Sequence, residues 1–112
     1  MITGAHAILY SSAAEEVRTF LHDVLGFGSV DAGGGWLIFA LPPAELAVHP
    51  TGGGSSTELY LMCDDIEATL AELKTKGVEC QPVTDQGWGL LSRLTLPDGS
   101  GLGIYQPRHP SP

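Results

Sequence analysis

The sequence predicts an α+β fold in which two tandem β-α-β-β-β modules form one curled mixed sheet, a cup or half-barrel with its helices outside. Residues 6–50 and 58–107 repeat the same order of strand, helix and turn signals, which is the first observation behind this prediction. The second is the composition, because fifteen glycines and eight prolines indicate many turns rather than a helical bundle. We expect a single domain over residues 1–112, with module one at about 1–50, a Gly/Ser-rich linker at 51–57 and module two at about 58–107.

Each module is expected to begin with a short apolar strand that leads into a helix. The strands are predicted at residues 6–11 (HAILYS) and 58–63 (ELYLMC). A capping box follows each strand, in which a Ser or Asp side chain and an acid three residues later satisfy free N–H groups at a helix start. The sequence therefore places the two helix starts at Ser12 with Glu15 and at Asp64 with Glu67.

Both predicted helices carry a single apolar stripe and end at a glycine. Gly26 and Gly77 stand where a left-handed C-terminal cap is expected. The helical spacing of the apolar residues predicts that one side of each helix faces the core. The stripe residues are Val17, Phe20, Leu21 and Val24 in the first helix and Ile66, Leu70 and Leu73 in the second.

Three more strands complete each module in this prediction. Short strands are expected at residues 28–31 and 80–83, and each is followed by a Gly-Trp pair that ends at Trp36 or Trp88. An apolar strand comes next in each half, WLIFAL and GLLSRLTL, and then a proline-containing turn. A last strand ends each module at a proline.

Side-chain alternation gives the first and last strands of each module an apolar face and a mixed face. The apolar face is expected to pack on the helices, which leaves the mixed face to line something else. Glycines at 101 and 103 leave the mixed face of the last strand bare, which makes room for a ligand there. The mixed-face residues are His6, Ile8, Tyr10, Glu45, Ala47 and His49 in module one, and Glu58, Tyr60, Met62, Gly101, Gly103 and Tyr105 in module two.

Composition restricts the classes of partner. Thirteen acidic residues against five scattered basic ones give a net charge of −8, which argues against nucleic acid because phosphate binding needs clustered Lys and Arg. The acidic surplus either attracts cationic ligands or serves solubility.

The absence of a long apolar run and of a basic signal-peptide region predicts a cytoplasmic protein with no membrane partner. Cys63 and Cys80 lack metal-site or redox spacing, which favours two free thiols.

This arrangement resembles the vicinal oxygen chelate superfamily, the group of glyoxalases, bleomycin resistance proteins and extradiol dioxygenases. The resemblance runs from His6 to Pro107 and rests most on three stretches, FLHDVLGF at 20–27, LMCDDIEATLAELKTKGVE at 61–79 and LPDGSGLGIYQP at 96–107. In that family two modules pair within one chain or across a dimer, and a ligand or metal lies inside the cup. The resemblance therefore implies that the mixed face lines the cup, and we expect a homodimer.

Metal-binding members of this family take His, Glu or Gln ligands from the first and last strands, so the resemblance puts His6 and Glu58 at ligand positions. The last-strand positions fall on Ala47 and Gly103, which cannot ligate, whereas a catalytic divalent metal (Zn, Ni, Mn or Fe) typically needs three protein ligands. His49 shares the face of Ala47, so a rearranged set of His6, Glu58 and His49 is one reading. The chain would then be a metal-dependent lyase, isomerase or dioxygenase with Glu58 as the catalytic carboxylate.

The aromatic residues give the competing reading, a cavity that binds a small molecule without a metal. Aromatic walls with nearby acids suit a flat aromatic or cationic ligand, through stacking and cation–π contacts. The missing metal ligands favour this reading, sequestration of a drug or metabolite as in bleomycin resistance proteins, over an enzyme and over a purely structural protein. The residues expected to line the site are Tyr10, Trp36, His49, Tyr60, Met62, Trp88, Gly103 and Tyr105.

Overall fold

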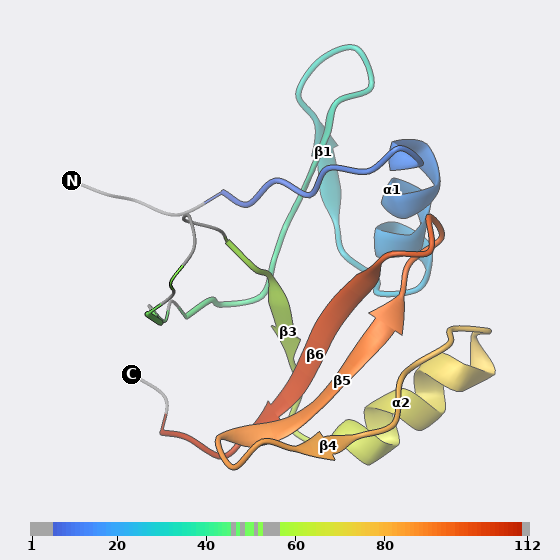
Figure 1. The fold of residues 1–112 in the computed structure, drawn as a ribbon. Coiled ribbons are helices and arrows are strands. Elements are labelled where there is room, and N and C mark those ends of the chain that lie inside the picture. Colours follow the sequence, from blue (N-terminus) through green and yellow to red (C-terminus); the bar gives the residue numbers. More distant parts are fainter. Residues whose placement is uncertain (1–5, 46, 48, 51, 53–56, 111–112) are drawn as a thin grey trace.

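A computed structural model describes residues 6–45, 47, 49–50, 52 and 57–110, and in this part of the chain it shows an α+β fold with two helices and two separate sheets (Figure 1). The fold class predicted from the sequence is therefore confirmed, although the two sheets do not close on each other. In chain order the elements are α1 (Ala14–Asp23), β1 (Ser29–Asp31), β2 (Leu37–Phe39), β3 (Tyr60–Met62), α2 (Ile66–Thr75), β4 (Thr84–Asp85), β5 (Gly89–Thr95) and β6 (Gly101–Pro107).

Module two has the predicted β-α-β-β-β order. Its strands form a sheet in the order β3-β6-β5-β4, in which β3 runs parallel to β6 and the other pairs are antiparallel. The strand predicted at 80–83 is displaced to β4, and Cys80 makes only an isolated bridge with Leu94. Pro82 explains the displacement, because proline has no N–H to donate to the ladder. On either side of Cys80, the Gln81 N–H donates to the Arg93 carbonyl at 3.0 Å and the Glu79 carbonyl accepts the Thr95 N–H at 2.9 Å.

Module one is less complete than its sequence suggests. Residues 6–11, predicted as its first strand, lie in no strand, and 6–10 are exposed, so that prediction is wrong for the single chain. The last strand is also missing from the described residues 45, 47 and 49, while 46 and 48 of the prediction lie outside them. What forms is the antiparallel hairpin β1-β2, whose residues are exposed apart from the half-buried Phe39. The hairpin of module one thus lacks the additional strands or the packed helix that a two-stranded sheet needs to be stable.

The helix of module one packs on module two, which explains why the strands of module one lack a helix to pack against. Phe20 of α1 belongs to the same buried cluster as Leu73 of α2, and Leu21, Val24 and Leu25 pack against that cluster. Both helices therefore pack against the buried cluster of module two, and α1 lies at the end of the sheet, near the turn between β5 and β6 in Figure 1. The other buried members of the cluster are Val78, Leu94, Leu96, Leu102 and Ile104, which confirms the predicted apolar face of the last strand.

The predictions of where the two helices begin and end are correct in part. Gly26 and Gly77 take positive φ values of 73° and 79° and close the two helices as predicted. At the start of α2 the cap is Asp65 rather than Asp64, and its carboxylate accepts the Ala68 N–H at 3.1 Å. At the start of α1 no side chain caps the helix, so the box predicted at Ser12 is wrong.

Ser11, the neighbour of Ser12, explains the start of α1. Its hydroxyl donates to Asp98 in the turn before β6 and accepts the Ala13 N–H at 3.1 Å. The segment before α1 is therefore fixed by a contact with module two rather than by a local cap.

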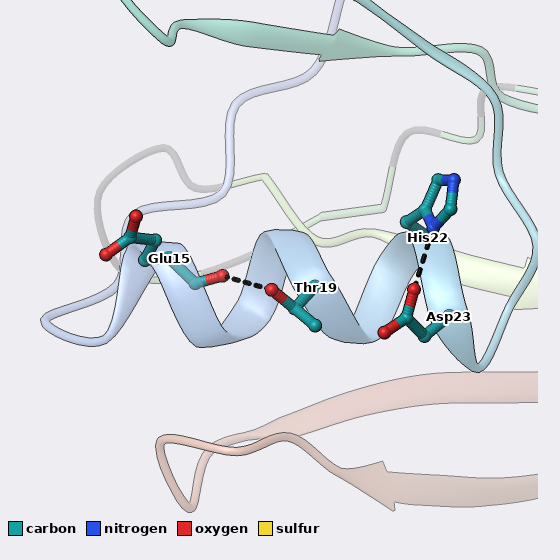
Figure 2. A network of polar contacts seen from close by, with 4 residues as sticks. All are labelled: Glu15, Thr19, His22 and Asp23. Carbon is teal, nitrogen blue, oxygen red and sulfur yellow. Dashed lines mark hydrogen bonds and ion pairs between the residues drawn. The ribbon is translucent and has the colours of Figure 1, made fainter.

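The outer side of α1 is polar and faces solvent. Figure 2 shows the Thr19 hydroxyl donating to the Glu15 carbonyl at 3.1 Å and the Nδ1 atom of His22 lying 2.8 Å from the Asp23 carboxylate. These residues are exposed, so His22 belongs to the solvent side of the molecule and not to a site. Neither α1 nor α2, the helices of the described part of the chain, has the length and apolar character needed to span a bilayer.

Candidate functional site

The face of the module two sheet turned away from the helices is the candidate site. Cross-strand register places Tyr60, Gly103 and Arg93 side by side across β3, β6 and β5, and likewise Met62, Tyr105 and Leu91. Neighbours in register point to the same side of a sheet, opposite to the buried Leu94, Leu102 and Ile104. We call these six residues (Tyr60, Met62, Leu91, Arg93, Gly103 and Tyr105) the open face.

Tyr105 is the centre of an aromatic cluster on the open face. Its ring lies 6.1 Å from that of Tyr60 and 5.2 Å from that of Trp88, both in edge-to-face geometry with interplanar angles of 89° and 76°. The imidazole of His109 lies 5.9 Å away, tilted by 37°. Edge-to-face contacts suit the ring quadrupoles and contribute about 0.5–1.5 kcal/mol each beyond burial. The structure thus brings together three of the predicted aromatic residues and adds His109, which was not among the residues predicted for the site.

Both tyrosine hydroxyls on the open face already have partners. The Tyr60 hydroxyl donates to the Glu58 carboxylate at 2.5 Å, and this bond, together with burial, raises the pKa of Tyr60. The Tyr105 hydroxyl lies 3.0 Å from Nε2 of His109, and burial raises the pKa of Tyr105. Both phenols therefore keep their protons at neutral pH, and the open face offers ring surfaces more than free polar groups.

Gly103 does not form the bare floor that the sequence suggested. A Cβ atom at this position would lie 2.5 Å from Cε1 of Tyr60 and closer still to Cδ1, so the tyrosine ring lies directly over the glycine. The missing side chain makes room for Tyr60 of the neighbouring strand, not for open space. The role of Gly103 as a ligand contact stays a prediction.

Arg93 is a member of the open face that the sequence reasoning missed. Its guanidinium lies over Gly101, where a Cβ atom would be 2.7 Å from Nε, and it donates to the Gly101 carbonyl at 3.1 Å. Alternation in GLLSRLTL, residues 89–96, was the available signal, because it puts Arg93 on the side opposite the buried Leu94. The open face thus carries one positive charge.

A shallow depression of about 500 Å³, widely open to solvent and called the cavity below, lies at the end of the open face, beside the start of α2. Burial raises the pKa of the Cys63 thiol, which donates to the Tyr105 carbonyl at 3.6 Å and so stays protonated. The Gln106 amide oxygen accepts the Ile66 N–H at 3.0 Å, which satisfies the start of α2. The cavity is lined by Met62, Cys63, Asp64, Gln106, Pro107 and His109.

The proposed metal ligands are not assembled in the single chain. Among the described residues, which include His6, His49 and Glu58, no three His, Cys, Asp or Glu side chains are placed to hold a metal ion. His6 and His49 are exposed in irregular segments, and the Glu58 carboxylate accepts the Tyr60 hydroxyl. The described residues do not assemble the predicted metal site within one chain, and both that site and a catalytic role for Glu58 stay predictions.

Two further predicted site residues lie on module one. Tyr10 is 89% exposed and Trp36 71% exposed, and in the described part of the chain no aromatic contact links either to Tyr105. The Trp36 ring instead lies under the Arg18 guanidinium, 5.7 Å from its centroid. The single chain thus divides the predicted aromatic set into a cluster on module two and isolated residues on module one.

Comparison with solved structures finds close likeness in fold over nearly the whole chain. TnmS3, an antibiotic binding protein from Streptomyces sp. CB03234, is 27% identical with a TM-score of 0.65, and the match covers 96% of this chain and 99% of that one. A glyoxalase/bleomycin resistance protein from the same organism is 28% identical with a TM-score of 0.59, covering 85% and 92%.

A third solved structure has the same fold at lower identity. A member of the glyoxalase/bleomycin resistance protein/dioxygenase superfamily from Sphaerobacter thermophilus is 22% identical with a TM-score of 0.67, covering 94% and 98%. No protein-family model matches the sequence, and no curated protein matches it.

Proposed function

Because the chain belongs to the vicinal oxygen chelate superfamily, the glyoxalase/bleomycin resistance/dioxygenase group, we propose that it binds a flat aromatic small molecule against its open face. The observation that carries the proposal is the cluster of Tyr60, Trp88 and Tyr105, whose rings are placed for edge and face contacts. The antibiotic binding activity of TnmS3, a protein of the same fold and length, supports a binding role for this chain.

Charge favours a cationic ring within this class. The net charge of −8 attracts cations from solution, and Asp64 lines the cavity beside the open face. The positive charge of Arg93 would repel a cation on one side of the open face. The Glu58 carboxylate already accepts the Tyr60 hydroxyl and so attracts a cation less. We therefore expect a planar cation to bind more tightly than a planar anion, with the ring contacts common to both.

Trp88 provides the first test of this proposal. Proflavine, a planar cation, and 1-anilinonaphthalene-8-sulfonate, a planar anion, serve as probes in calorimetric titrations. Replacing Trp88 with alanine removes one aromatic contact, which at about 0.5–1.5 kcal/mol corresponds to roughly two- to tenfold weaker proflavine binding.

The control for this test is His22→Ala on the solvent side of α1, which should leave proflavine affinity unchanged (Figure 2). Equal weakening in both variants, or no heat from either probe with the unmodified protein, would contradict binding at the open face.

We also propose that the protein is a homodimer, because module one leaves apolar side chains uncovered in the single chain. Val30 and Ile38 are register partners in the β1-β2 hairpin, yet they are 66% and 42% exposed. An isolated two-stranded hairpin is marginal in water, so it needs a surface to pack on. In the described sheet of module two, β3 has a free edge, and Leu59 beside it is exposed. A second copy of the chain would supply a matching surface for both features.

Light scattering after size exclusion tests the dimer. The unmodified protein is expected at twice its 11.7 kDa chain mass at micromolar concentration. Ile38→Asp should give monomers, because a charge would then have to be buried in the interface. Ala71→Asp, on the exposed side of α2, is the matched control and should remain dimeric. A monomeric unmodified protein would refute the proposal.

A further inference from the structure

The chain after β6 is held at Arg108 by two bonds to module two. The Arg108 N–H donates to the Trp88 carbonyl at 2.9 Å, and its guanidinium donates to the Asp85 carboxylate at 2.8 Å. The Gly87 N–H and Arg108 hold the pKa of Asp85 below its ordinary value, so this carboxylate is charged at neutral pH. Arg108 is therefore a fixed point beside the aromatic cluster.

Beyond this point the chain turns so that His109 lies against Tyr105. Nδ1 of His109 lies 2.9 Å from the Pro110 carbonyl, which can only accept a hydrogen bond. In the neutral imidazole the proton is then on Nδ1, and Nε2 is left to accept the Tyr105 hydroxyl at 3.0 Å. His109 is half-buried in this position and forms part of the cavity wall.

Residues 109 and 110 are held less firmly than Arg108. Their described contacts to the sheet are one hydrogen bond between uncharged groups and one tilted ring contact, both with Tyr105. Arg108 is held by a main-chain hydrogen bond to Trp88 as well as by its exposed ion pair with Asp85, so both contacts must break to release it. The tail thus has a firm hinge at Arg108 followed by a weakly held imidazole on the central ring of the open face.

We propose that residues 109–110 form a displaceable strap over the binding site, and that an aromatic ligand must move His109 to reach Tyr105. The inference rests on the proposed function, since it concerns the same aromatic cluster. When the strap leaves, the Tyr105 hydroxyl becomes a free hydrogen-bond donor for an acceptor atom of the ligand. The strap thereby lowers affinity for rings that cannot compete with the imidazole.

Proflavine affinity of three variants tests the strap. His109→Ala removes the competing ring, and Tyr105→Phe keeps the phenyl ring but removes the hydroxyl that holds the strap. Each single variant is expected to bind proflavine roughly two- to tenfold more tightly, the range set by one neutral hydrogen bond. The double variant should match His109→Ala, because both changes release the same strap. Weaker binding in His109→Ala would refute the strap and show that His109 contacts the ligand. Unchanged binding would also refute it and show that His109 takes no part in binding.

Proton NMR of the imidazoles tests strap docking without any ligand. The His109 signal, identified by its loss in His109→Ala, should show a ring-current shift from Tyr105 that shrinks in Tyr105→Phe. Proflavine should move it towards the position of a free histidine. A His109 signal without a ring-current shift overturns the strap even if proflavine binds. A normal docked signal together with no proflavine binding by any variant would instead refute the proposed function.

Discussion

Replacing Phe20 with alanine is expected to lower the free energy of unfolding by about 3–5 kcal/mol, the usual cost of deleting a buried phenyl ring. Phe20 is only 8% exposed and lies in the cluster with Leu73 and Ile104 of module two. The loss should appear in a single cooperative urea transition followed by far-UV circular dichroism. Because small domains are stable by only about 5–15 kcal/mol, this one change removes a large share of the total.

Two companion variants sharpen this result. Phe20→Leu keeps most of the volume and should cost less than about 1.5 kcal/mol. Thr19→Ala, at the exposed neighbouring position, should change stability by less than about 0.5 kcal/mol. If Phe20→Ala were as mild as Thr19→Ala, α1 would not be part of the core of module two, and the arrangement of the helices described above would be wrong.

A methyl group at Gly103 is expected to destabilise the protein by about 1–3 kcal/mol, the cost of overpacking a filled site. The three nearest atoms to a Cβ at Gly103 all belong to the Tyr60 ring, so Gly103→Ala must push that ring off the open face. Proflavine binding should weaken along with stability, because Tyr60 would leave the Tyr105 cluster. Urea denaturation and calorimetry measure the two effects.

A double-mutant cycle with Tyr60→Ala identifies the cause. Without the ring, alanine at 103 should stabilise the strand by about 0.5–1 kcal/mol relative to glycine, so the sign of the effect reverses. Gly28→Ala, where a Cβ would meet no atom within 4 Å, is the control and should be close to neutral. Equal costs of Gly103→Ala with and without Tyr60 would show that the ring does not lie over the glycine.

Local patterns predicted those parts of the fold that depend on near neighbours. Alternation in the last strand separated Leu102 and Ile104 from Tyr105, and the helical stripes identified Phe20 and Leu73 as core residues. The repeat of strand and helix signals gave the order of module two. These features follow from the periods of strands and helices, which a sequence displays directly.

Contacts between distant segments could not be found in this way. Ser11 bonds to Asp98, 87 positions away, and this contact replaces the local cap expected at Ser12. Residues 6–10 have a good strand pattern, but the described part of the chain offers them no partner strand, and strand pairing depends on residues far away in the sequence. The place of His109 likewise depends on the hydrogen bond to Tyr105, and nothing in the sequence of the tail indicates it.

The packing of α1 on the sheet of module two also sets an order of events during protein synthesis. Phe20 is buried against strands that end with β6, so the helix leaves the ribosome long before its core partners exist. The parallel pairing of Tyr60 with Gly103 adds a second contact between distant positions. Such non-local contacts slow folding, because a long loop must close before they form. An emerging module one therefore keeps its apolar helix stripe exposed until the strands up to β6 have been synthesised, and during this interval the stripe is open to non-native contacts.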